Sequence, residues 1–355
     1  MEKYTNLKNN RVSLKDAIPL ETPFTLFVDP TNRCNFKCSF CPRNQDDFHD
    51  YAGDYTDMDK NVFDKIVSDL KEFPNRLKVI RLFYLGEPLL SKNFTYILNQ
   101  VINNHLAERV EISTNASLLT KEMSKEILSA AALGECGVVS VYLRVSVYSV
   151  IQDKNEHITS NPISVETIFN NVDNFKKMRD EMHLSNVRIY AKKLTTFDDE
   201  DACFKEIYYP AVDEVELEEP MEWSSEGNRE LLDDVYSSEE IASIKNKTMP
   251  KVCAFPFHTM AIQSDGDVVC CCTDWTRGTF IGNVKKESLL DIWNGEKIRK
   301  LQYLHLSGKR SEIPCCKNCL RLPCGGAYEA DNLDNVDPDE FVKKCGDIRH
   351  EKKSS

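Results

Sequence analysis

Asp29-Pro-Thr-Asn-Arg-Cys-Asn-Phe-Lys-Cys-Ser39, closed by Phe40-Cys41-Pro42, is the stretch of sequence that decides the fold. It sets Cys34, Cys38 and Cys41 in the spacing C-x3-C-x2-C. The run 24–28 directly before it is rich in β-branched and aromatic residues, which predicts a buried strand. We therefore expect the thiols on a loop that leaves the end of a strand.

These thiols suit an iron–sulfur cluster, because soft sulfur ligands hold iron and a short loop can wrap one edge of a cluster. A structural zinc ion usually takes four protein ligands, and this loop contains no fourth Cys or His. The nearest alternative zinc ligand is His49, which lies past the polar turn at 45–47. Three cysteines on a four-iron cluster leave one iron without a protein ligand, and a metal centre does chemistry at such an open position.

The loop resembles the cluster loop of the radical S-adenosylmethionine (SAM) superfamily, and Phe40 before the third cysteine matches the aromatic residue usual in that family. The resemblance implies that Cys34, Cys38 and Cys41 bind a [4Fe–4S] cluster whose open iron chelates the amino and carboxylate groups of SAM. It also implies that an electron from the cluster cleaves SAM to a 5′-deoxyadenosyl radical.

The overall composition limits the expected partners and location. The chain has 355 residues, enough for one large and one smaller domain. Its 45 basic and 57 acidic residues give a net charge of −12 with no Lys/Arg-rich run, which argues against nucleic acids and acidic membranes as partners. No apolar stretch approaches the ~18 residues of a membrane span, and residues 1–10 lack the apolar segment of a signal peptide. We expect a cytoplasmic protein.

The cysteines predict two separate metal centres. The chain has 14 of them, and in a reducing compartment metal binding explains so many better than disulfides do. Three lie between 34 and 41, and eight lie between 253 and 324.

Strand-like runs alternate with amphipathic helix-like runs from residue 24 to about 220, a pattern that predicts parallel strands joined by right-handed crossovers. The expected strands are 24–29, 78–85, 109–114, 138–147, 187–193 and 213–218. Six such units fit an open, partial (β/α)6 TIM-like barrel, the α/β fold that the resemblance implies. Chemistry is then expected at the C-terminal ends of the strands.

Four regions are expected along the chain: an N-terminal arm over the barrel (1–22), the partial barrel (23–223), a polar linker (224–250) and a C-terminal domain (251–355). The arm leaves no room for the peptide-recognition domain that family members acting on ribosomal peptides often carry before the cluster loop.

The second strand runs into Leu85-Gly-Glu-Pro-Leu89. Gly86 permits a turn and close approach to a ligand, and Glu87 is left at the end of the strand. An ordinary strand-to-loop turn is the alternative. The stretch resembles the Gly-Gly-Glu motif of the family, whose backbone and acidic side chain meet the amino group of SAM. Leu85 replaces the first glycine here, so the resemblance implies a role for Glu87 more firmly than a backbone contact at position 85.

The third and fourth strands supply further expected SAM contacts. The end of the third strand, 112–116, resembles the family's Thr-Asn-Gly segment, in which an amide binds the ribose hydroxyls; Asn115 is that amide unless it merely closes an Asx turn. The fourth strand alternates so that Arg144 and Ser146 share one face. The resemblance implies that Ser146 contacts the SAM carboxylate. Arg144 neutralises that carboxylate, binds substrate, or is solvated or salt-bridged.

The last two strands of the barrel supply expected substrate contacts. Arg188, Tyr190 and Lys192 form one face of the fifth strand. The sixth strand and its exit carry Glu214, Glu216, Glu218 and Trp223. We take Glu216 as the candidate catalytic carboxylate, and carboxylates beside an aromatic face suit a polyhydroxylated or amino-bearing substrate.

A second group of cysteines follows the linker. Asp265-Gly266 between two alternating apolar runs predicts a hairpin, which brings Cys253 back towards the run 270–272. Cys253, Cys271, Cys316 and Cys319 then give C-x17-C-x44-C-x2-C, a set that holds either zinc or a second iron–sulfur cluster.

The region from the Cys-Cys pair through Trp275, 281–284 and 292–294 resembles the SPASM/twitch extension of radical SAM enzymes, which houses auxiliary [4Fe–4S] clusters. Its spacing departs from the two-cluster form, because Tyr328 stands where a cysteine would follow Cys324. The resemblance therefore favours one auxiliary cluster on Cys253, Cys271, Cys316 and Cys319. A second cluster would use Cys316, Cys319, Cys324 and Cys345. Cys270 and Cys272 either pack or supply a thiol that reaches substrate.

The predicted function follows from the auxiliary cluster. A cluster ligated by four cysteines accepts electrons more naturally than it binds substrate, and the one-cluster spacing resembles radical SAM dehydrogenases that oxidise an aminocyclitol. We therefore expect oxidation of a secondary alcohol of a small sugar-like or aminocyclitol substrate to a ketone, with flavodoxin or ferredoxin as reductant. The alternatives are a sugar epimerase that uses Cys270 or Cys272 and a peptide maturase. A non-enzymatic electron-transfer module is disfavoured because three-cysteine ligation leaves an iron open.

Overall fold

A curved mixed sheet organises the protein. The computed structural model describes residues 13–135, 139–219, 237–245, 250–317, 319 and 329–354. Within these residues, nine strands form one sheet in the order β6-β5-β4-β3-β2-β1-β7-β8-β9. The strands are β1 (Thr25–Val28), β2 (Leu77–Arg81), β3 (Ala107–Thr114), β4 (Ser140–Val147), β5 (Val187–Leu194), β6 (Glu214–Glu218), β7 (Thr259–Ile262), β8 (Asp267–Val269) and β9 (Phe280–Asn283).

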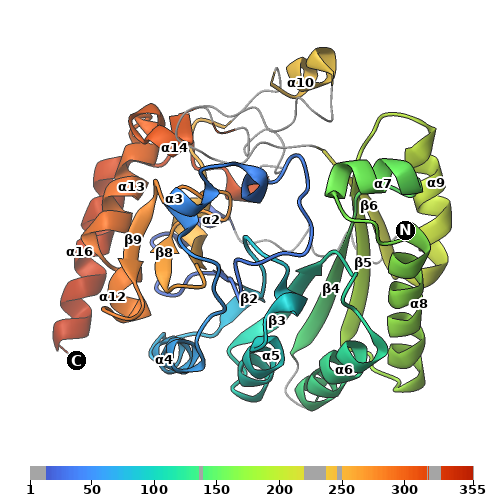
Figure 1. The fold of residues 1–355 in the computed structure, drawn as a ribbon. Helices are drawn as coiled ribbons and strands as arrows, with labels where there is room; N and C mark the ends of the chain where they lie inside the picture. Colours follow the sequence, from blue (N-terminus) through green and yellow to red (C-terminus); the bar gives the residue numbers. More distant parts are fainter. Residues whose placement is uncertain are drawn as a thin grey trace.

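Strands β1 to β6 are parallel, and the strand order leaves β6 at one edge of the sheet and β9 at the other. The sheet is therefore unclosed, as expected for a partial barrel, and all six predicted barrel strands are present. Figure 1 shows the sheet bending, with α4, α5, α6 and α8 along its outer side. The crossover helices are α4 (Lys60–Leu70), α5 (Phe94–Asn103), α6 (Lys121–Glu135), α7 (Gln152–Thr159), α8 (Val165–Glu181) and α9 (Asp199–Tyr208).

The crossover helices form where the sequence supplies a cap and an apolar stripe. Helix α4 begins after Asp59, whose side chain accepts a hydrogen bond from Asn61 N at 2.8 Å. Helix α8 begins after Ser164, which accepts from Thr167 N at 3.0 Å. Four apolar residues of α4 face the core and are buried: Phe63, Ile66, Val67 and Leu70.

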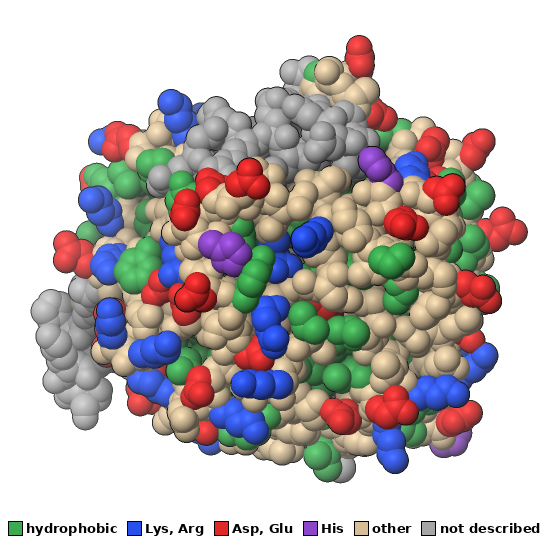
Figure 2. Space-filling model, in the orientation of Figure 1, with side chains coloured by type: hydrophobic (Ala, Val, Ile, Leu, Met, Phe, Trp, Pro, Cys, Tyr) green, Lys and Arg blue, Asp and Glu red, His purple; other side chains and the backbone are tan. Residues whose placement is uncertain are grey.

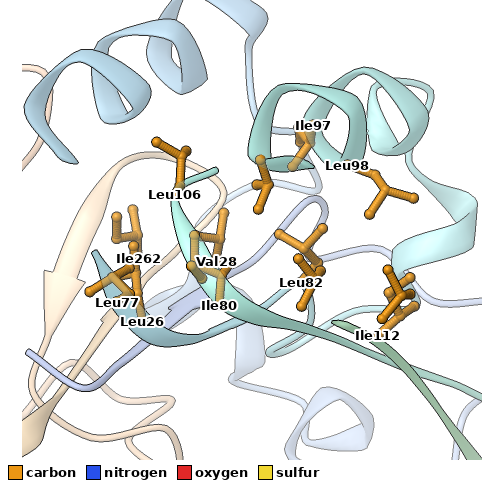
Figure 3. Packing of buried hydrophobic residues seen from close by; sticks show 14 of the residues in the cluster. Leu26, Val28, Leu77, Ile80, Leu82, Ile97, Leu98, Leu106, Ile112 and Ile262 are labelled. Carbon is orange, nitrogen blue, oxygen red and sulfur yellow. The ribbon is translucent and has the colours of Figure 1, made fainter. Parts of the chain in front are cut away.

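The core fills the space between these helices and the outer face of the sheet. Figure 3 shows Ile97 and Leu98 of α5 close to Leu82 and Ile112 on the sheet side. All four side chains are fully buried, and each such burial contributes roughly 1.5–3 kcal/mol. The inner face is different. In β4 the residues alternate between buried and half-buried, so Arg144 and Ser146 lie on the inner face, as predicted.

The C-terminal region continues the barrel sheet. Strand β7 pairs with β1 in parallel, and β8 and β9 follow antiparallel. The predicted hairpin is present, with Gly266 at φ +95° in its turn. The sheet thus crosses from the predicted barrel region into the predicted C-terminal domain. The boundaries 1–22, 23–223, 224–250 and 251–355 stay predictions.

The remaining helices surround this extension and the segments before and after the barrel. Ser288 caps one of them, α12, by accepting from Asp291 N at 3.1 Å, as the sequence predicted. Trp293 Nε1 donates to Leu20 O at 2.8 Å, which fastens the N-terminal segment to the C-terminal region. Among the described residues, no helix has both the length and the apolar character needed to cross a membrane. The helices other than the barrel crossovers are α2 (Leu14–Ala17), α3 (Phe48–Ala52), α10 (Ser238–Lys245), α11 (Phe255–His258), α12 (Leu289–Trp293), α13 (Glu296–Leu306), α14 (Pro314–Lys317) and α16 (Pro338–Ser354).

Candidate active site

The cysteine loop leaves the end of β1, where the sequence predicted it. Cys41 N donates to Cys38 O at 3.0 Å, and Phe36 N donates to Cys34 Sγ at 3.4 Å. Cys38 is buried, and the other two cysteines are half-buried. Burial raises the pKa of Cys38 well above its usual value, and the nearby Cys41 and Cys34 raise it further. The three thiols are therefore close neighbours.

The chemistry of these side chains fits an iron–sulfur cluster. Burial raises the pKa of Cys34 to about 12, so this thiol keeps its proton until a metal ion displaces it. Among the described residues, no three His, Cys, Asp or Glu side chains are close enough together to hold a single metal ion. The thiols would have to turn towards one centre to bind a cluster. His49, the alternative ligand, hydrogen-bonds through Nδ1 to Gly53 O at 3.0 Å.

Gly86 lies against the backbone of the cysteine loop. A Cβ atom at position 86 would overlap the carbonyl oxygen of Thr31 and lie 2.5 Å from that of Arg33. The next residue, Glu87, donates its N–H to Arg33 O at 2.8 Å. Glycine is therefore required here by the cysteine loop itself, whether or not its backbone also approaches SAM.

The Glu87 carboxylate ties the ends of β2 and β3 together. It accepts hydrogen bonds from Thr114 Oγ1 at 2.7 Å, from Asn115 N at 2.8 Å and from Leu89 N at 3.1 Å. Burial raises the pKa of Glu87 to about 7, although these hydrogen bonds favour the charged form. The proximity of Glu87 also raises the pKa of Cys34. Glu87 therefore lies beside the cysteine loop, where a cation bound near the cluster would reach it.

Asn115 links the third strand to the cysteine loop. Its Nδ2 donates to Asn35 Oδ1 at 3.0 Å, and its Oδ1 accepts from Ser117 N at 2.9 Å. The second bond is the Asx turn that the sequence left open as an alternative. The turn uses one end of the amide, and the other end contacts the loop between Cys34 and Cys38.

Aromatic rings pack against one another where the cysteine loop meets the end of β4. Tyr148, which follows β4, lies 5.9 Å from Phe40 and 5.8 Å from Phe36 between ring centroids. Phe40, predicted from the resemblance as a cofactor contact, is thus placed beside the thiols and packed against the exit of the fourth strand. Ser146 is half-buried on the same face of β4, two positions before Tyr148.

Farther down the inner face, one carboxylate is shared by three arginines. Glu111 of β3 lies 2.8 Å from Arg81 Nε, 2.9 Å from Arg109 Nη2 and 3.6 Å from Arg144 Nη1. Burial would raise the pKa of Glu111, but the attraction of the arginines outweighs it and lowers that pKa. Arg81, Arg109 and Glu111 were not among the residues predicted from the sequence. Period-two alternation along β2 and β3 was the signal that could have placed them on the inner face.

Arg144 reaches from this group to the sixth strand. It lies 3.2 Å from Glu218 Oε1, and Lys192 Nζ lies 2.8 Å from Glu218 Oε2. The predicted alternative of a salt-bridged Arg144 is therefore realised. Glu216 pairs in register with Lys192, and Trp223 lies outside the described residues.

The four predicted auxiliary ligands come together from three parts of the chain. Burial raises the pKa of Cys253 to about 12, and the nearby Cys319 and Cys316 contribute to that rise. A hydrogen bond with Cys272 and burial raise the pKa of Cys271, and the nearby Cys319 and Cys253 raise it further. Cys319 N lies 3.4 Å from Cys316 O in the predicted C-x2-C turn. Four neighbouring thiols have the donor chemistry of a second iron–sulfur cluster. Like the thiols of the first loop, they would have to turn towards one centre to bind it.

The cysteines on either side of Cys271 lie in different surroundings. Cys270 is 1% exposed and lies near Cys316 and Cys253. Cys272 packs against the apolar cluster that contains Phe27, Tyr84 and Trp275. It also lies close enough to Arg81 for the charge of its thiolate to raise the pKa of that arginine, against the larger lowering by burial. Cys272 is therefore on the barrel side, whereas Cys270 is on the auxiliary side. Cys345, a ligand of the predicted second cluster, is buried in α16. Cys324, another of its ligands, lies outside the described residues, as does Tyr328.

Comparison with sequence families finds two matches. The radical SAM superfamily matches residues 28–191, and the SPASM iron–sulfur cluster-binding domain matches residues 253–320. A protein of Pyrococcus furiosus named "tungsten-containing aldehyde ferredoxin oxidoreductase cofactor-modifying protein" is 27% identical over 335 residues. The match covers 84% of this chain and 88% of that protein.

Solved structures share the fold at low identity. Native anSMEcpe with bound AdoMet has a TM-score of 0.56 at 14% identity, covering 92% of this chain and 100% of that one. BtrN in complex with AdoMet and 2-DOIA has a TM-score of 0.50 at 17% identity, covering 83% and 92%. Streptococcus suis SuiB bound to precursor peptide SuiA has a TM-score of 0.50 at 15% identity, covering 92% and 76%. These likenesses establish the fold alone.

Proposed function

Because this chain belongs to the radical SAM superfamily and carries a SPASM domain, we propose that it oxidises a secondary alcohol of a small polar substrate to a ketone. The two domains imply a [4Fe–4S] cluster, SAM and auxiliary iron–sulfur clusters. When bound, the first cluster supplies the electron that cleaves SAM to a 5′-deoxyadenosyl radical, which abstracts hydrogen from the substrate. The observation that carries the proposal is the three-thiol loop beside a half-barrel with a charged inner face.

In this proposal the residues around the cysteine loop bind and orient SAM. Cys34, Cys38 and Cys41 hold the cluster. Glu87, which is buried next to Cys34, accepts hydrogen bonds from the SAM amino group. The remaining SAM contacts are assigned to Phe40, Gly86, Asn115 and Ser146.

The residues deeper in the half-barrel bind the substrate. Loss of a hydrogen atom from carbon, of a proton from the hydroxyl group and of one electron converts an alcohol to a ketone. Glu216, on the last barrel strand, is the proposed acceptor of the hydroxyl proton. An auxiliary cluster on Cys253, Cys271, Cys316 and Cys319 would supply the acceptor for the electron.

Product stoichiometry tests this function. Anaerobically reconstituted protein, SAM and dithionite would be incubated with a panel of cyclitols, aminocyclitols and sugars in deuterium oxide. We expect one ketone per 5′-deoxyadenosine and no deuterium at carbon in the recovered substrate. Recovered substrate with inverted configuration and solvent deuterium at carbon would contradict oxidation.

Sugar epimerisation is the second candidate, because Cys272 packs beside Tyr84 and Phe27 on the barrel side. A thiol there can return a hydrogen atom to a substrate radical. If the protein is an epimerase, Cys272→Ala would abolish deuterium incorporation while 5′-deoxyadenosine still forms, and Cys270→Ala would leave the incorporation unchanged.

The Pyrococcus furiosus relative suggests another substrate class. Its name states that it modifies a cofactor, and the similarity covers most of both chains. The same assay with cofactor extracted from a tungsten-containing aldehyde ferredoxin oxidoreductase would test this class. Turnover of that cofactor, and of no cyclitol or sugar, would identify a maturation enzyme. A peptide maturase has no comparable support, since the SuiB likeness establishes the fold alone.

A further inference from the structure

A cavity of about 230 Å³ opens on the inner face of the half-barrel, away from the cysteine loop. Strands β2 to β6 supply its lining, and the lining residues are Arg81, Arg109, Glu111, Tyr142, Arg144, Arg188, Tyr190 and Glu214. Arg144 lies four positions before Tyr148, which packs on the cysteine loop. Four strand residues span about 13 Å. The distance between the cavity and the loop is therefore comparable to the length of one small molecule.

The lining carries more positive than negative charge. Four guanidinium groups and two carboxylates surround the cavity, although the chain as a whole has a net charge of −12. On the outside, acidic and basic side chains are interspersed over the face shown in Figure 2. The surplus of arginine is therefore a local feature of the inner face and does not follow from the composition.

Glu111 holds the arginines in place without using all of their N–H groups. Glu111 is 5% exposed, and its two oxygens contact Arg81, Arg109 and Arg144. A carboxylate cannot satisfy every N–H of three guanidinium groups. Arg109 Nε is buried and has no hydrogen-bond partner among the described residues. Arg109 also stacks over Tyr142, 4.9 Å from the ring centroid, and Arg144 stacks over Tyr190 at 5.6 Å.

A purely structural ion-pair network explains these observations less well. Burying charge costs free energy unless each charge is matched. Arg144 is matched by Glu218, but Arg81 and Arg109 share Glu111, and the buried Nε of Arg109 has no hydrogen-bond partner among the described residues. Burial lowers the pKa of Arg81, and the adjacent Arg144 and Arg109 lower it further, against the attraction of Glu111. An added anion would relieve this repulsion.

We propose that this cavity binds an oxyanion of the substrate, either a phosphate or a carboxylate, through Arg81, Arg109, Arg144 and Arg188. The inference rests on the proposed function and specifies its substrate class: a small polar molecule with an anionic end that lies below SAM. Guanidinium groups form paired hydrogen bonds with both oxyanions. Glu111 spaces the arginines and competes with the bound anion.

Anion binding by the reconstituted holoprotein tests the proposal without any turnover. Inorganic phosphate and malonate would be titrated separately by calorimetry, in chloride buffer of constant ionic strength and without reductant. Arg109→Gln removes a cavity charge, and Arg76→Gln removes an exposed charge on the loop before β2. We expect Arg109→Gln to weaken anion binding about tenfold and Arg76→Gln to leave it unchanged.

Two further variants keep the result decisive. Glu111→Gln removes the competing carboxylate, so it should bind the anion more tightly than the wild type does. Arg188→Gln changes an exposed lining residue, so this variant should fold. It should weaken anion binding, and it therefore tests the proposal even if Arg109→Gln fails to fold. Preference for phosphate or for malonate would identify the source of the oxyanion.

No binding of either anion to the wild type would overturn the proposal, and so would equal affinities in the wild type and the Arg188→Gln variant. Because SAM cleavage is not measured in this titration, failure here leaves the proposed oxidation standing. Failure of SAM cleavage would likewise leave the anion site standing.

Discussion

The two groups of thiols in this protein are assembled in different ways. Cys34, Cys38 and Cys41 lie on one continuous loop after β1. The auxiliary thiols come from a segment before β7, from the end of the hairpin, from α14 and from the residue two positions after α14. The first group is therefore fixed by local sequence, whereas the second exists only when distant segments pack correctly.

The backbone around the two groups shows the same difference. The cysteine loop touches Gly86 through main-chain oxygens, which cannot move without moving the loop. In the auxiliary region, Gly282 of β9 faces the Ile292 side chain, whose atoms can shift without moving the main chain. The first group should therefore tolerate few changes nearby, and the second should tolerate small adjustments.

The largest expected effect is on iron content. Replacing Cys34, Cys38 and Cys41 together with alanine should remove about four irons and leave those of the auxiliary region in place, because no auxiliary segment needs the loop thiols. Iron and sulfide analysis of anaerobically reconstituted protein checks this. Loss of all iron would show that the two groups are not independent.

The second prediction compares the two glycines. Gly86→Ala should abolish iron binding at the cysteine loop, because the added methyl group overlaps main-chain oxygen atoms of that loop. Gly282→Ala should cost about 1–3 kcal/mol of stability and leave loop iron intact, since its Cβ would lie 2.7 Å from Ile292 Cγ1, a side-chain atom of the auxiliary region. Iron content and thermal unfolding measured for both variants decide the matter. Equal iron loss in the two would refute the comparison.

The third prediction concerns pH. Burial raises the pKa of Glu87 to about 7, so the folded metal-free chain holds this proton more tightly than the unfolded chain does. Its contribution to stability is fully present below about pH 4.5, and on the order of 3 kcal/mol is lost as the pH rises to about 7. Glu87→Gln cannot titrate and should lack this part of the pH dependence. Urea unfolding at pH 5 and pH 7.5 measures it, and parallel pH profiles in both proteins would contradict the assignment.

The smallest expected effect is on the auxiliary centre alone. Hydrogen bonds from Cys315 and His305 lower the pKa of Cys316, and His305 is 1% exposed. Hydrogen bonds to sulfur ligands tune the potential of a cluster. His305→Phe should therefore shift the auxiliary reduction potential to a more negative value, and the exposed His157→Phe should not. Electron paramagnetic resonance during a redox titration reports both, and identical potentials would exclude this role for His305.

Local patterns predicted much of this architecture. The six barrel strands, the hairpin at Gly266 and the cap at Ser288 depend on neighbours in the sequence, and the structure contains each of them. The resemblance of the two cysteine-containing regions to the radical SAM and SPASM families is supported by the family matches.

Long-range pairing was not predictable in the same way. The shared carboxylate Glu111 depends on how β2, β3 and β4 align, and the sequence does not show strand register. The need for glycine at position 86 likewise arises from contact with Thr31, which is distant in the sequence. Nothing local indicated that β7 would pair with β1 and join the two thiol groups through one sheet.

The measurement that tests the central claim most directly is the release of 5′-deoxyadenosine. Reconstituted wild-type protein with SAM and dithionite should release it, slowly even without substrate, and the Cys34/Cys38/Cys41→Ala variant should release none. Absence of 5′-deoxyadenosine from the wild type, or equal release by both proteins, would contradict radical SAM chemistry at this loop.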